Sequence, residues 1–67
     1  MVQIYINGEA RTVAPDTHVS ALVADMQLTG KRYAIERNGE IIPKSKHAET
    51  RVESGDSYEI VVAVGGG

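Results

Sequence analysis

The sequence predicts a two-layer α+β domain, in which one amphipathic helix covers one face of a mixed sheet. Two patterns support this: residues 2–6 alternate apolar and polar side chains, and residues 18–28 carry apolar side chains at helical spacing. Apolar residues make up 42% of the 67-residue chain, which is enough for one small core. The chain therefore has room for one domain and no second one.

The first predicted element is a β-hairpin. Val2, Ile4 and Ile6 share one face of a strand over residues 2–6. Asn7-Gly8 follows, and both residues tolerate the positive φ that a type I′ turn requires. The chain should therefore reverse and return over residues 9–13.

The helix is predicted over residues 18–28, about three turns long. Thr17 is the expected N-cap, with Asp16 as the alternative. Gly30 suits the left-handed residue that closes the helix. One apolar stripe should face the sheet, at Val19, Leu22, Val23 and Met26.

A second hairpin is predicted after the helix. Residues 33–37 alternate again, Asn38-Gly39 repeats the turn signal, and residues 40–42 form a short return strand that Pro43 stops.

The last third of the chain is predicted to be a loop followed by one strand. Residues 44–52 are polar without a clear period, so we expect a loop with one short helical turn. Ser54-Gly55-Asp56 is a turn signal, and residues 58–64 form the most apolar strand.

Both faces of this last strand are apolar, apart from Glu59. Only one helix is available to cover them, so two interpretations remain open. Either the strand is central and its outer face is half covered, or Val61 and Ala63, together with Tyr5, form an exposed patch that binds a partner.

Composition excludes several functions. The net charge of −2 argues against nucleic-acid binding, and the absence of cysteine rules out disulfides and a thiolate metal site. Residues 60–64 are the longest uncharged apolar run, which is too short to cross a membrane. The N-terminus lacks the pattern of a signal peptide, so we expect a cytoplasmic protein.

Catalysis by this chain is not expected. No serine has a recognisable His-Asp partnership, and no pair of carboxylates is placed for acid–base chemistry. His18 and His47 lie in different segments, so we expect a first-turn helix residue and a surface loop residue, with no metal site.

The C-terminal glycines are the most unusual chemistry in the chain. Gly65, Gly66 and Gly67 form a flexible tail after a domain of residues 1–64. Such an arm can enter a tunnel too narrow for any Cβ, and it reaches roughly 10 Å when extended. It would deliver the α-carboxylate of Gly67, which must be activated by another protein before it can react. A frayed terminus or cloning scar is the less favoured interpretation.

With these residues in view, the whole chain resembles the ThiS family, the sulfur carriers of thiamine thiazole biosynthesis. The most specific stretch is Asn38-Gly39-Glu40-Ile41-Ile42-Pro43-Lys44, which looks like the family's Asn-x-Glu-hydrophobic-hydrophobic-Pro-basic motif. Weaker similarities lie at Asn7-Gly8-Glu9, at residues 17–22, at residues 53–56 and at Gly66-Gly67.

The resemblance implies a ubiquitin-like β-grasp fold, with one helix on a mixed four- to five-stranded sheet whose first and last strands are parallel at its centre. It also implies a route for sulfur. A ThiF-like adenylating enzyme would use ATP and magnesium to adenylate the Gly67 carboxylate, and this chain would bind no cofactor itself. A cysteine-desulfurase persulfide would supply the sulfur, and thiazole synthase would accept it. The free carrier would be a monomer.

Other functions remain open at this stage. The small subunit of molybdopterin synthase looks similar in fold and ends in Gly-Gly, although that family is usually longer and richer in Phe. A ubiquitin-like modifier and a regulatory or RNA-associated β-grasp module are further alternatives.

Overall fold

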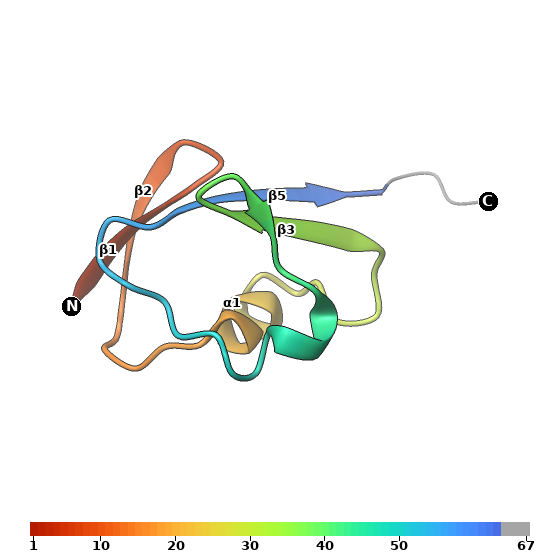
Figure 1. Ribbon diagram of the computed structural model, residues 1–67, viewed down its shortest axis with the longest axis horizontal. Coiled ribbons are helices and arrows are strands. Elements are labelled where there is room, and N and C mark those ends of the chain that lie inside the picture. Colours follow the sequence, from red (N-terminus) through yellow and green to blue (C-terminus); the bar gives the residue numbers. More distant parts are fainter. Residues whose placement is uncertain (64–67) are drawn as a thin grey trace.

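The computed structural model describes residues 1–63 and has two layers. Helix α1 (Val19–Asp25) and the short 3₁₀ helix η1 (Lys44–Lys46) lie on one side of a five-stranded sheet (Figure 1). The strands, in chain order, are β1 (Val2–Ile6), β2 (Glu9–Val13), β3 (Tyr33–Arg37), β4 (Glu40–Ile41) and β5 (Ser57–Val62). The predicted α+β class is therefore confirmed.

The sheet is mixed, in the order β2-β1-β5-β3-β4. The outer pairs β1–β2 and β3–β4 are antiparallel hairpins, whereas β5 lies at the centre, parallel to β1 and antiparallel to β3. The first and last strands are thus central and parallel, as the family resemblance implied.

Both Asn-Gly turns adopt the backbone that their residues favour. The φ angles are 51° at Asn7, 84° at Gly8, 50° at Asn38 and 90° at Gly39. Positive φ at both central residues is the requirement of a type I′ turn, so the two predicted hairpins are confirmed.

The core lies between α1 and the inner face of the sheet, the face toward the helix. Three residues of the predicted stripe, Val19, Leu22 and Val23, are buried, and Met26 packs against them. The sheet contributes the fully buried side chains of Ile4, Ile35 and Tyr58. This burial is the main source of stability for so small a domain.

The helix is shorter than predicted, because it ends at Asp25 rather than at Leu28. Gln27 is the left-handed residue that follows the helix, with a φ of 60°, whereas Gly30 adopts its positive φ of 85° in a later turn and does not close the helix. Leu28 is still buried, with 5% of its surface exposed. The apolar pattern therefore continues past the helix into a loop that packs on the same core.

The start of the helix also differs from the prediction. His18 is the N-cap residue, and neither Thr17 nor Asp16 caps the helix with its side chain. The first helical N–H groups instead donate to backbone carbonyls of the loop, from Val19 to Thr50 at 2.9 Å and from Ser20 to His47 at 3.0 Å. A neighbouring segment thus satisfies donors that a capping side chain usually satisfies.

The remaining elements agree with the sequence in outline. The loop contains the expected short helical turn as η1, and Gly55 has a φ of 87° in the turn before β5. The second strand of the second hairpin ends one residue early, at Ile41. Strand β5 begins one residue early, at Ser57, and ends at Val62, short of the predicted end at Val64. Val64 lies outside the described residues, and so does the predicted domain boundary that follows it.

Candidate functional site

The residues expected to carry the chemistry are Gly65, Gly66 and Gly67, and all three lie outside the described residues. The structure therefore bears on strand β5, which precedes the tail in the sequence. Two parts of β5 differ in character: the start of the strand with the turn before it, and the end of the strand at Val61 and Val62 with the Ala63 that follows.

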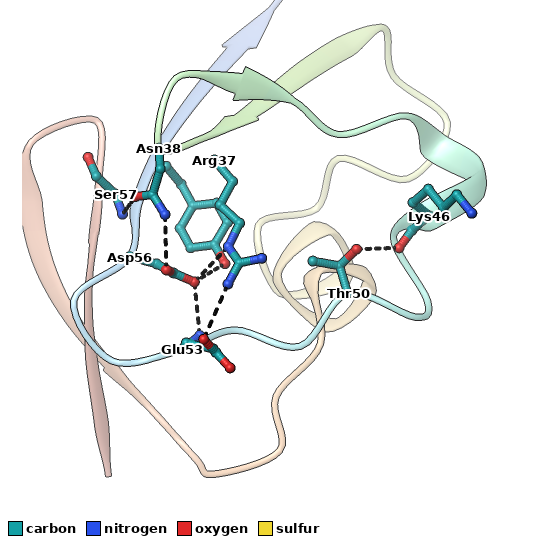
Figure 2. A network of polar contacts seen from close by, with 8 residues as sticks. Arg37, Asn38, Lys46, Thr50, Glu53, Asp56 and Ser57 are labelled. Carbon is teal, nitrogen blue, oxygen red and sulfur yellow. Dashed lines mark hydrogen bonds and ion pairs between the residues drawn. The ribbon is translucent and has the colours of Figure 1, made fainter.

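At its start, β5 is held by a polar network around the carboxylate of Asp56 (Figure 2). Asp56 accepts hydrogen bonds at 2.9 Å from Arg37 Nε, from the Tyr58 hydroxyl and from the Glu53 backbone N–H. Asn38 Nδ2 donates a fourth, at 3.3 Å. Only 6% of the surface of Asp56 is exposed, so these partners replace the water that an ionised carboxylate needs.

The network shifts the ionisation of its members. Burial opposes ionisation of Asp56, yet hydrogen bonds from Glu53, Tyr58, Arg37 and Asn38 outweigh it and hold the pKa of Asp56 below its ordinary 3.8. Burial, and then the hydrogen bond to Asp56, raise the pKa of the Tyr58 hydroxyl. Burial disfavours the Arg37 guanidinium, but the hydrogen bond and charge of Asp56 leave its pKa raised. All three groups therefore keep their usual charge states at neutral pH.

The second hairpin is also tied to the start of β5. The Asn38 backbone N–H donates to the Ser57 carbonyl at 2.8 Å, and the Asn38 side chain accepts from the Ser57 N–H at 3.0 Å. The same Asn that forms the predicted turn therefore fixes the register of β3 against β5.

On its other side, β5 is held by the side chain of Asn7. The Asn7 amide oxygen accepts from the Ile60 N–H at 2.8 Å, and its Nδ2 donates to the Ile60 carbonyl at 3.2 Å. Strand β1 has already ended at Ile6, so a side chain supplies the two hydrogen bonds that a further residue of β1 would supply. The pairing of β5 on this side therefore extends to Ile60.

At its end, β5 displays apolar side chains on the outer face, the face of the sheet opposite α1. Val61 is 63% exposed, and the register places Ala34 of β3 directly opposite it. Ala63 is also exposed, and its N–H donates to the Arg32 carbonyl at 2.9 Å, which continues the pairing beyond the strand. We call Ala34, Val61 and Ala63 the outer patch. A shallow groove adjoins it, lined by Arg32, Tyr33, Ala34, Val61, Val62 and Ala63.

The two interpretations of the last strand are therefore both correct in part: the strand is central, and its outer face is exposed at Val61 and Ala63. Tyr5 is exposed as well, at 39%, but it does not belong to the outer patch. The register places Tyr5 opposite Ser57, four residues before Val61 on β5. At about 3.3 Å per residue, that separation is roughly 13 Å along the strand.

His47 is not the surface residue that the sequence predicted. It is 6% exposed, and its ring stacks on Tyr33 with 5.8 Å between ring centroids. Its Nε2 donates to the Ile42 carbonyl at 3.2 Å, which leaves Nδ1 to accept from the Tyr33 hydroxyl at 3.4 Å. Lys44 Nζ lies 4.8 Å from the centre of the Tyr33 ring. Because neighbours inside the fold occupy both ring nitrogens, His47 is a structural residue.

His18 is partly buried, at the N-cap of α1, and donates from Nδ1 to the Asp16 carbonyl at 2.9 Å. Within residues 1–63, no three His, Asp or Glu side chains gather as metal ligands would. In the same range, no helix has the length and apolar character needed to cross a membrane.

Sequence reasoning missed the polar residues that position β5. Asn7, Asn38 and Asp56 were interpreted only as turn residues, yet each bonds to β5 or to its neighbours through its side chain. One signal for Asp56 was available: it directly precedes the most apolar strand, where a carboxylate at the edge of the core needs partners.

One helix on a five-stranded mixed sheet with a parallel central pair defines a ubiquitin-like β-grasp protein, and the comparisons with known proteins agree with this class. The structure superposes with a TM-score of 0.81 on the crystal structure of thiamine biosynthesis protein ThiS from Geobacter metallireducens. The two are 28% identical, and the match covers 98% of this chain and all of the other. The sequence profile of the ThiS family matches residues 4–67, so the chain belongs to the ThiS family.

Two relatives bear on the role of this family member. The sulfur carrier protein ThiS of Bacillus subtilis is 38% identical over 65 residues, which cover 96% of this chain and 98% of that protein. A thiazole synthase of Paramagnetospirillum magneticum is 41% identical over 66 residues, which cover 98% of this chain. The chain spans only 20% of the length of that second relative.

Proposed function

We propose that this member of the ThiS family carries sulfur on the α-carboxylate of Gly67 and delivers it for formation of the thiazole of thiamine. The chain is a sulfur carrier protein of thiamine biosynthesis rather than a catalyst. One observation supports Gly67 most directly: the match to the family runs through the last glycine, so the tail falls within the shared region.

The proposed chemistry begins with activation of a poor electrophile. A ThiF-like enzyme joins the Gly67 carboxylate to the α-phosphate of ATP and releases pyrophosphate, with magnesium at the enzyme. The terminal sulfur of a cysteine-desulfurase persulfide then attacks the acyl carbon, and AMP leaves. A thiol cleaves the resulting acyl disulfide, is itself oxidised to a disulfide, and leaves a thiocarboxylate on Gly67. Thiazole synthase finally accepts this sulfur.

The geometry of β5 supports this role. Strand β5 is anchored at its start by Asp56 and along its side by Asn7, so its direction relative to the core is fixed. The exposed Val61 lies at its end and the exposed Ala63 follows it, one residue before the tail in the sequence. An apolar surface at the base of an arm suits docking that aims the arm into an active site.

The relatives favour thiazole synthase as a partner. The Paramagnetospirillum magneticum protein of that name contains a segment similar to nearly the whole of this chain. A carrier-like segment and a thiazole synthase thus occur in one polypeptide, which suits two activities that act together. Family membership likewise favours the thiamine pathway over the molybdopterin, modifier and RNA-associated alternatives.

The test is an intact-mass measurement of the full chain purified with its adenylating and desulfurase partners. We expect a mass increase equal to one sulfur minus one oxygen, and fragmentation should place the change on Gly67. An unmodified terminus under conditions in which the partners are active would contradict the proposal, as would sulfur on any other residue.

A further inference from the structure

A pair of acidic side chains faces outward beside the outer patch. The register of β3 and β5 sets Glu36 directly opposite Glu59. Ile35 and Ile60, their neighbours along the strands, are buried against the helix side, so both carboxylates lie on the outer face with Ala34 and Val61.

This pair is unfavourable in the free protein. Directly opposite residues of antiparallel strands have Cβ atoms about 4.5–5.5 Å apart, and like charges at that separation repel. Neither carboxylate forms an ion pair in the part of the chain that the structure describes. Arg37, the nearest cation in the sequence, is bound to Asp56 and Glu53 instead.

The acidic pair is set in an apolar surface. In the next row of the sheet, Val61 is 63% exposed and lies against Ala34. On the side of β3 away from β5, Ile41 of β4 lies opposite Glu36 and is 67% exposed. A partner that covers this face would therefore cover two carboxylates together with aliphatic side chains, and it would have to neutralise them.

We propose that Glu36 and Glu59 together receive one basic side chain of thiazole synthase when that enzyme covers the outer patch. The proposal rests on the sulfur-carrier function above and names the chemistry of its docking surface. An arginine suits the site best, because its planar guanidinium can donate to two carboxylates at once. Thiazole synthase is the chosen occupant because a protein of that name contains a segment 41% identical to this chain.

Loss of a carboxylate from this pair should have opposite effects on the stability of the free chain and on its affinity for thiazole synthase. Removing one charge of the pair relieves repulsion in the free chain, so its stability should stay level or rise. The same change removes a partner of the enzyme's cation, so docking should weaken. If the two residues had a purely structural role, their removal would not weaken docking while sparing stability, and the effect on docking would not depend on salt.

The experiment compares E36Q, E59Q and the double variant with the unchanged chain. The control is E9Q, which removes the same charge on β2 at the far edge of the sheet. Urea unfolding measures the stability of each free chain. Titration calorimetry measures the affinity of each unmodified full-length chain for thiazole synthase, between about 50 mM and about 300 mM salt.

For the double variant we expect unchanged or higher stability, an affinity at least about tenfold lower at low salt, and a much flatter salt dependence. E9Q should behave as the unchanged chain does. Equal affinities for all chains would overturn the proposal, as would equal losses in E9Q and E59Q. It would also fail if the losses appeared with the adenylating enzyme and not with thiazole synthase.

The same preparations separate this inference from the proposed function. The double variant keeps its tail, so at saturating partner concentrations it should still acquire sulfur on Gly67. If the unchanged chain acquires none, the carrier function itself is wrong. If the unchanged chain acquires sulfur and the double variant also docks normally, only the role of the acidic pair is wrong.

Discussion

The two ends of strand β5 are built in opposite ways. At its start, Asp56 is almost fully buried and accepts four hydrogen bonds from side chains and backbone. At its end, Val61 is 63% exposed and contributes little to the core. The contrast teaches that stabilising contacts lie at one end of the strand and exposed apolar surface at the other, so each can be changed while the other is kept.

The largest expected effect comes from the C-terminal tail, which follows the end of β5 in the sequence. Deletion of Gly67 should abolish adenylation and sulfur transfer, because the reactive carboxylate is then carried one residue too far back. The unfolding curve should be unchanged, since the core is formed by residues within 1–63. Intact-mass analysis and urea unfolding check the two statements. Normal thiazole production by the truncated chain would show that Gly67 is dispensable.

Breaking the start of β5 should mainly affect stability. D56A leaves Arg37, Asn38 and the buried Tyr58 hydroxyl without their acceptor, so we expect a loss of about 3 kcal/mol in the free energy of unfolding. E49A is the control: it removes an exposed ion pair with Lys46 and should cost less than about 1 kcal/mol. Urea unfolding measures both. A loss in D56A no larger than in E49A would mean that the network is not stabilising.

Changing the end of β5 should mainly affect docking. V61R places a charge in the outer patch, and we expect affinity for thiazole synthase to fall about tenfold or more. Because Val61 is mostly exposed, the free energy of unfolding should change by less than about 0.5 kcal/mol. A10R, on the outer face of β2, is the matched control and should dock normally. If V61R instead unfolds the domain, Val61 belongs to the core.

The smallest expected effect is the response to acid. The pKa of Asp56 is lower in the folded chain than the ordinary value of 3.8 that it regains on unfolding. Its contribution to stability is therefore complete above pH 3.8 and is lost as the pH falls through the folded-state pKa. The urea midpoint should therefore fall as the pH drops from about 4 to about 2, and it should fall less in D56N. Parallel curves for the two chains would assign acid sensitivity to other carboxylates.

Much of the fold could be predicted because its signals are local. The two Asn-Gly turns and the alternating strands need only neighbouring residues, and all of them were confirmed. The helix boundaries were wrong because the decisive contacts are distant in sequence. Carbonyls of Thr50 and His47 accept from the first helical N–H groups, and Leu28 reaches the core from a loop.

In the candidate site too, features with local signals could be predicted from the sequence, and features that depend on distant contacts could not. The exposure of Val61 and Ala63 is one of two interpretations left open by a surplus of apolar residues over the surface that one helix can cover. The buried state of His47 could not be predicted, because it depends on stacking against Tyr33, fourteen residues away. The exclusion of Tyr5 from the outer patch likewise depends on the register of a parallel pair, which no local pattern specifies.

The amide of Asn7 has a consequence for how far β5 stays paired beyond the end of β1. Its side chain takes the place of one more residue of β1. The first hairpin can therefore turn away while the N–H and the carbonyl of Ile60 both stay hydrogen-bonded. Strand β5 can then extend beyond the end of β1 on that side without leaving the backbone groups of Ile60 unpaired. The position of this asparagine thus sets where pairing between β1 and β5 stops, so a longer first hairpin would accompany β5 further toward Val62.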